Sequence, residues 1–183
     1  MSAAPVAAPV AAPVAAPSGP ALDRLREEQR QIEDLFTRYF EHQRDPAFRP
    51  PEALRLATLI FTLLRVHDEL ESGVLQPALA SRIGTHPALG EVAAQRADVS
   101  LAIDRMEALG ASDAARNGAM HELAREVGEW FAASERSLYL LAHESGLNRA
   151  RLDTELAARQ EALLSSDSGD ANGIAAEQGE LQR

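Results

Sequence analysis

Hydrophobic residues recur at alternating steps of three and four along most of this chain. This spacing places side chains on one face of an α-helix and is typical of the seam between the helices of a bundle. It predicts four long helices, at about 21–42, 51–81, 87–110 and 113–146, and a shorter fifth helix at about 148–164. Pro77 lies within the last turns of the second helix and is expected to kink or loosen that end. The connections are short, which favours antiparallel neighbours. The sequence therefore predicts an all-α protein, an up-down-up-down four-helix bundle with a short additional C-terminal helix and disordered termini.

The two ends of the chain differ from this pattern. Residues 1–20 carry an AAPV repeat, and a proline at every fourth position is incompatible with a regular helix, so we expect an extended tether. Residues 165–183 are rich in Ser, Asp, Gly, Asn, Glu and Gln, which predicts a disordered tail. The expected organisation is thus a tether at 1–20, a bundle at 21–146, an accessory helix at 147–164 and a tail at 165–183.

Composition narrows the classes of function. The formal net charge is −10, and no cluster of basic residues suggests nucleic-acid binding. Cysteine is absent, which excludes disulfides and thiolate metal sites. We find no apolar run of membrane-spanning length and no signal-peptide pattern, so neither a membrane partner nor secretion is indicated, and a cytoplasmic protein is the default expectation.

Each of the four long seams has a polar residue near its middle. The seam of the second helix contains His67 and Glu71, which lie one turn apart on the same face. An inward His and carboxylate from one helix are used by metal sites in bundle cores, although a hydrogen-bonded core histidine beside a seam-edge carboxylate is the simpler interpretation. The other polar members are Gln29, Arg96 and Glu135, the last of these one turn after Phe131. Because antiparallel helices of similar length bring their middles to the same height, these residues are expected to meet.

This arrangement resembles the hemerythrin-like, or HHE cation-binding, family of four-helix bundles, over about Leu22–Leu141. Members of that family hold two iron ions through one His from the first helix, His-x-x-x-Glu from the second, one His from the third and His-x-x-x-Glu from the fourth. The four matching segments here are LREEQRQIEDLF, LRVHDELESGVLQPAL, EVAAQRADVSLAI and EVGEWFAASERSLYLL. His67, Glu71 and Glu135 stand at ligand positions, whereas Gln29, Arg96 and Phe131 replace the expected histidines.

The three replacements bear on whether a metal is bound. Gln29 is a weak neutral ligand, Phe131 cannot ligate, and Arg96 brings a fixed positive charge to the place where a cation would sit. Buried carboxylates need a compensating charge, which Arg96 would provide by pairing with Glu71 and Glu135. We therefore expect an Arg96-centred polar network and no cofactor. The alternatives are an Arg96 side chain that reaches solvent, and a retained iron or zinc site built from His67, Glu71 and Glu135.

The remaining candidates are interpreted as structural. Histidines away from the seams are expected at the surface, namely His42, His86, His121 and His143. Asp68 and Glu69 are expected to face outward, and Trp130 and Tyr139 to pack against the fifth helix. We find no catalytic triad and no glycine-rich phosphate loop. The sequence thus favours a non-catalytic interaction or regulatory module with an unidentified protein partner. The alternative is a divergent metal protein for sensing, storage or redox work.

Overall fold

The computed structural model describes residues 19–44, 50–108 and 113–180, and within these ranges every regular element is helical. The elements in chain order are α1 (Pro20–Gln43), α2 (Pro50–Leu70), η1 (Glu71–Leu75), α3 (Gln76–Ile83), α4 (Pro87–Ala108), α5 (Asp113–Ala133), η2 (Ser134–Tyr139), α6 (Leu140–Glu144) and α7 (Arg149–Glu180). The predicted all-α class is confirmed. The structure describes no helix that is long and apolar enough to cross a membrane.

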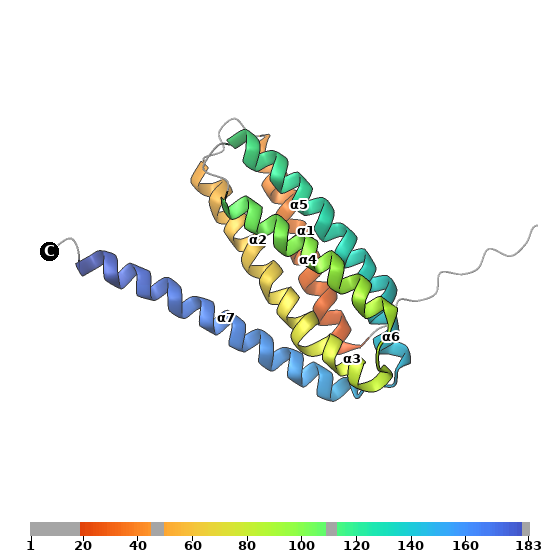
Figure 1. Ribbon diagram of the computed structural model, residues 1–183. Coiled ribbons are helices and arrows are strands. Elements are labelled where there is room, and N and C mark those ends of the chain that lie inside the picture. Colours follow the sequence, from red (N-terminus) through yellow and green to blue (C-terminus); the bar gives the residue numbers. More distant parts are fainter. Residues whose placement is uncertain (1–18, 45–49, 109–112, 181–183) are drawn as a thin grey trace, which may run out of the picture.

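The helices form a bundle with one projecting arm. Figure 1 shows α1, α2, α4 and α5 side by side, while α7 packs beside one end of the bundle and then leaves it. The helix expected at 51–81 is the continuous run α2–η1–α3, and the helix expected at 113–146 is the run α5–η2–α6. Within the described residues, α1 packs against α2 and α4 packs against α5.

The core is built from the predicted seams. All six seam residues of α1 are buried: Leu22, Leu25, Gln29, Ile32, Phe36 and Tyr39. The seam of α2 is buried too, from Ala57 through Ile60, Leu64 and His67 to Glu71. Burying one leucine or isoleucine of this kind stabilises the fold by about 1.5–3 kcal/mol, so the seams account for much of the bundle's cohesion.

Two π-helical turns, η1 and η2, interrupt the long helices, and the sequence pattern did not reveal them. After Glu71 the buried residues are Leu75 and Leu79, at two successive steps of four, whereas the predicted seam passed through Val74, which is only half-buried. A π-helical turn holds more residues than an α-helical turn and so moves the seam by one position. Pro77 follows in the first turn of α3, where its missing N–H is tolerated.

The C-terminal helix is longer than expected. The sequence predicts an end near Leu164 and a disordered tail from 165, whereas α7 continues to Glu180. No proline interrupts this segment, and a helix that has already formed can add residues without a new nucleation step. The predicted tether falls mostly on residues 1–18, which, like 181–183, lie outside the described residues.

Candidate functional site

His67 and Glu71 lie in the centre of the bundle. His67 is in the last turn of α2 and Glu71 is the first residue of η1. Both side chains are fully buried, and His67 Nε2 lies 3.5 Å from Glu71 Oε1. The i, i+4 spacing predicted from the sequence therefore brings the two groups together on the inner face.

The Glu71 carboxylate accepts hydrogen bonds from three buried side chains of the α5–η2 run. Trp130 Nε1 donates to Oε2 at 3.0 Å and Ser134 Oγ donates to the same oxygen at 2.9 Å. Tyr139 Oη donates to Oε1 at 2.8 Å. Because a carboxylate has about four lone-pair directions, these donors together with His67 fill the acceptor capacity of Glu71.

His67 is held by a second carboxylate, from α1. Its Nδ1 lies 3.0 Å from Oε2 of Glu28, whose side chain is buried. The amide nitrogen of Gln29 lies 3.4 Å from His67 Nε2 and donates to Tyr139 Oη at 2.9 Å. Phe131 packs its ring edge-on to the imidazole, with centroids 5.1 Å apart. The resulting buried polar cluster comprises Glu28, Gln29, His67, Glu71, Trp130, Ser134 and Tyr139.

The cluster favours a protonated histidine. Burial alone lowers the pKa of His67, but the hydrogen bonds to Glu28 and Glu71 outweigh it and raise the pKa to about 9. Burial raises the pKa of Glu71, and the contact with His67 and the hydrogen bonds from Tyr139 and Ser134 outweigh it, so the net pKa is lowered. Burial and the nearby Glu71 raise the pKa of Tyr139 well above its usual value, which keeps its hydroxyl protonated. At neutral pH the site is thus an imidazolium between two carboxylates.

The structure corrects the predicted role of Arg96. Its Nε forms an ion pair with Oδ1 of Asp68 at 2.8 Å, and no ion pair joins it to Glu71 or Glu135 among the described contacts. Arg96 lies half-buried on α4, and Asp68, expected to be solvated, lies one residue beyond His67 on α2. Because His67 already supplies the positive charge inside, Arg96 is not needed there. The polar network is centred on His67.

Glu135 is also separated from the cluster. Its carboxylate pairs in bidentate fashion with Arg26 of α1, at 2.6 Å from Nε and 3.0 Å from Nη2. The Arg26 guanidinium also lies over the Tyr139 ring, 5.4 Å from its centroid. The pair therefore covers the outer side of Tyr139. Glu135 does not approach His67 and Glu71 as a third ligand would.

Four members of the cluster were missed by the sequence analysis. Trp130 and Tyr139, expected to pack against the fifth helix, donate to Glu71, as does Ser134. Glu28 had a detectable signal, because it interrupts a second apolar stripe of α1 formed by Ala21, Leu25, Ile32 and Leu35. The four remaining histidines are exposed, as predicted: His42, His86, His121 and His143.

The donor set of this cluster does not fit a metal ion. Glu71 receives three N–H and O–H donors, and the protonated His67 carries a proton on Nδ1, facing Glu28, and on Nε2, facing Glu71, so neither residue has a free lone pair for a cation. Within the part of the chain that the structure describes, no group of three or more His, Asp or Glu side chains is arranged to hold a metal. No protein-family model, curated protein or solved structure matches this chain. The site must therefore be interpreted from its own chemistry.

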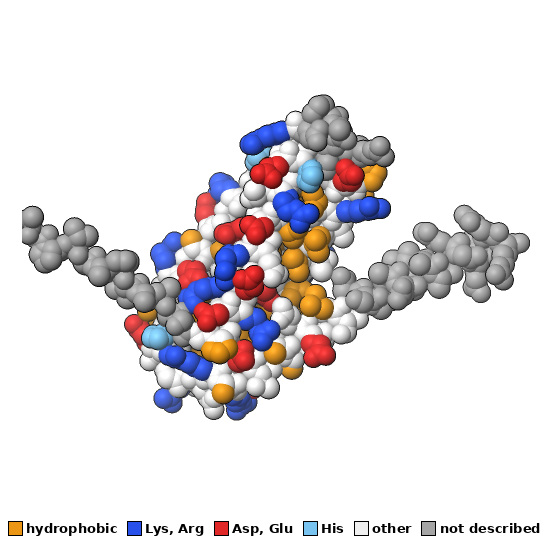
Figure 2. All heavy atoms as spheres, turned by 180° about the vertical axis from the view of Figure 1, so that it is seen from behind, with side chains coloured by type: hydrophobic (Ala, Val, Ile, Leu, Met, Phe, Trp, Pro, Cys, Tyr) orange, Lys and Arg blue, Asp and Glu red, His pale blue; other side chains and the backbone are white. Residues whose placement is uncertain are grey.

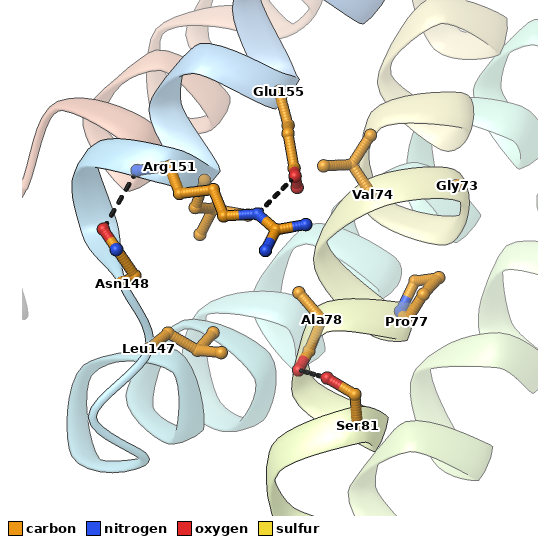
Figure 3. Close-up of a pocket in the computed structure, with 10 residues that line it drawn as sticks. Gly73, Val74, Pro77, Ala78, Ser81, Leu147, Asn148, Arg151 and Glu155 are labelled. Carbon is orange, nitrogen blue, oxygen red and sulfur yellow. Dashed lines mark hydrogen bonds and ion pairs between the residues drawn. The ribbon is translucent and has the colours of Figure 1, made fainter.

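A surface pocket lies apart from the cluster, between α7 and the run η1–α3. Figure 3 shows Gly73, Val74 and Pro77 on one side and Arg151 and Glu155 on the other. Arg151 Nε donates to Glu155 Oε1 at 2.7 Å, so the two charges of the pocket compensate each other. The pocket thus marks the edge of the contact between α7 and the bundle.

Proposed function

We propose that this chain is a hemerythrin-like, up-down-up-down four-helix bundle that no longer holds di-iron and acts as a non-catalytic interaction or regulatory module. The observation that carries the proposal is the hydrogen bonding of Glu71. Its carboxylate stands where the resemblance expects a metal ligand, yet it accepts from Trp130, Ser134 and Tyr139. In a metal site those lone pairs would face the cation.

Charge supports the same proposal. A di-iron centre compensates the carboxylates around it, and a bundle that lost the metal would have to neutralise them differently. Here the proton on His67, held between Glu28 and Glu71, supplies one positive charge beside Glu71. In this proposal the proton on His67 takes the place of the metal charge, which explains why His67 and Glu71 are kept although the metal is lost.

Access to the cluster also supports a non-catalytic role. His67, Glu71 and Ser134 are fully buried, and the aromatic rings of Trp130 and Phe131 pack directly on the imidazole. A substrate would have to displace core side chains to reach these groups. We therefore expect the chain to act through its surface, by binding other proteins and not nucleic acid or a membrane.

Elemental analysis tests the proposal. The full chain is purified from cells grown with added iron and zinc, alongside His67→Ala and the matched surface variant His86→Ala. We expect all three to contain the same background of metal, far below one ion per chain. Near-stoichiometric metal that is lost in His67→Ala and kept in His86→Ala would overturn the proposal and identify a divergent iron or zinc protein.

A further inference from the structure

α2 carries a second apolar stripe beside its seam. Leu56, Leu59, Leu63, Val66 and Leu70 follow one another at steps of three, four, three and four, so they share one face of the helix. Their exposure changes along the stripe: Leu70 is 0% and Val66 7% exposed, whereas Leu59 is 44% exposed. One end of the stripe is covered and the other is open.

α7 covers the closed end. Leu152 and Leu156 of α7 are buried and Leu163 is half-buried against the core. Three polar contacts fix the helix: Arg159 pairs with Glu69 of α2 at 2.5 Å, Asp153 with Arg24 of α1 at 3.5 Å, and Gln160 donates to Glu28 of α1 at 2.5 Å. α7 therefore sits in the groove between α1 and α2.

The groove continues beyond the part that α7 occupies. Figure 1 shows α7 leaving the bundle, and Figure 2 shows a band of hydrophobic side chains along the bundle near that point. On α2 this part carries Leu59, which is exposed, between Leu56 and Leu63, which are half-buried against the core. After Leu164 the sequence reads SSDSGDANG, which has no large apolar residue to cover them. The chain thus covers the Leu70 end of this stripe with its own helix and leaves Leu59 exposed.

We propose that the α1–α2 groove binds an amphipathic helix of another protein, and that α7 competes with this helix from within the chain. This inference rests on the proposed interaction function and specifies its surface. The contacts of α7 indicate what such a partner helix must carry. It needs leucines in a three–four seam, a basic residue facing Glu69, and an amide or hydroxyl donor for Glu28. A partner helix that continues the seam by two further turns would meet the exposed Leu59. In a second copy of this chain, residues 165–173 would follow Leu164, and they contain no large apolar residue to meet Leu59.

The same contacts connect the groove to the core. Gln160 donates to Oε1 of Glu28, whose other oxygen faces His67 Nδ1 at 3.0 Å. When α7 is displaced, Glu28 loses this donor unless the incoming helix replaces it. The requirement for a donor at that position therefore distinguishes a matching helix from any apolar helix.

A peptide pair tests the proposal. The first peptide has the sequence of residues 149–173, and the second carries Asp167→Leu and Asp170→Leu, which continue the seam of Leu156 and Leu163. Both are labelled with fluorescein and titrated with the full-length protein by fluorescence anisotropy. Because the added leucines bury against the open end of the groove, we expect the second peptide to bind about tenfold more tightly or better.

Three protein variants locate the binding and the competition. Leu59→Glu should weaken binding of the second peptide by about tenfold, while Leu101→Glu, at an equally exposed leucine of α4, should leave it unchanged. Arg159→Glu in the protein places like charges together at Glu69 and loosens α7, so both peptides should bind about two- to fivefold more tightly. Circular dichroism confirms that each variant is folded.

Several results would overturn the inference. These are equal affinities for the two peptides, equal effects of Leu59→Glu and Leu101→Glu, or no gain from Arg159→Glu. A dimer in sedimentation velocity that Leu59→Glu dissociates would assign the groove to a second copy instead. Metal content, measured on the same preparation, separates the two proposals: bound metal refutes the proposed function without affecting the peptide result, and a metal-free protein that binds neither peptide refutes only the groove.

Discussion

The proton on His67 should make the stability of the fold depend on pH in a defined window. The pKa of His67 is raised from 6.5 to about 9 in the folded protein. A raised pKa means that the folded state binds the proton more tightly than the unfolded chain does. The stabilisation is therefore complete below about pH 6.5 and is lost as the pH rises through 9. The difference between the two pKa values corresponds to about 3 kcal/mol at about 1.4 kcal/mol per unit.

Urea unfolding followed by circular dichroism, at pH values from 6 to 10, measures this loss as a falling free energy of unfolding. The window is favourable because the chain contains neither lysine nor cysteine, which would otherwise titrate near its upper end. The lowered pKa of Glu71 contributes stability that is lost only on acidification, so it does not act in this window. The opposite sign of the two shifts predicts greatest stability at mildly acidic pH.

His67→Gln should remove the slope between pH 6.5 and 9, and the exposed-histidine control His86→Ala should keep it. If His67→Gln does not fold, the imidazole resonances of the wild-type protein report the pKa of His67 directly by NMR. A flat stability curve over this range in the wild-type protein, or a His67 that titrates at or below its usual pKa, would refute the description of the cluster as a buried ion pair.

Two further substitutions distinguish the interior of the cluster from its edge. Tyr139→Phe removes the hydroxyl that donates to Glu71, leaving a buried acceptor with one partner fewer, and should lower the free energy of unfolding by about 1–3 kcal/mol in urea titrations. A loss within error would show that the hydroxyl adds nothing to the cluster. Arg96→His should cost less than about 1 kcal/mol and create no metal site, because Arg96 pairs with Asp68 at the rim. Uptake of iron or zinc by this variant would contradict the assignment.

The sequence predicts which residues are buried wherever the α-helical repeat continues without interruption. The seam of α1, and that of α2 as far as Glu71, follow the α-helical repeat, so burial of Gln29, His67 and Glu71 could be predicted from spacing alone. That repeat fails at the π turns. In the α5–η2 run Trp130, Ser134 and Leu138 are buried at steps of four, whereas a three–four pattern continues from Ser134 to Ser137, which is only half-buried. The predicted inward placement of Glu135 follows from a step of four after Phe131.

The spacing of residues in the sequence does not show that His67, and not Arg96, is the buried cation. Arg96 occupies a seam position, and a fixed positive charge opposite carboxylates suggested a direct pair. Its actual partner, Asp68, is adjacent to His67 in sequence but lies at the rim of the bundle. Which of two candidate cations enters the core depends on side-chain reach and on Glu28, a residue of the second stripe of α1 that also contacts α7.

Each of the two π turns adds one residue to its helical run, compared with a regular α-helix. The runs are α2–η1–α3 and α5–η2–α6. Both π turns begin at members of the cluster, Glu71 and Ser134, which hydrogen-bond to each other at 2.9 Å. Deleting the exposed Gly73 would restore a three–four spacing from Glu71 to Leu75 and Leu79, so the packing of the leucines does not require the extra residue. The extra residue in each π turn is thus tied to the polar cluster, and the spacing of the hydrophobic residues does not depend on it. A shortened relative could keep the same core while holding its glutamate and serine at a different distance.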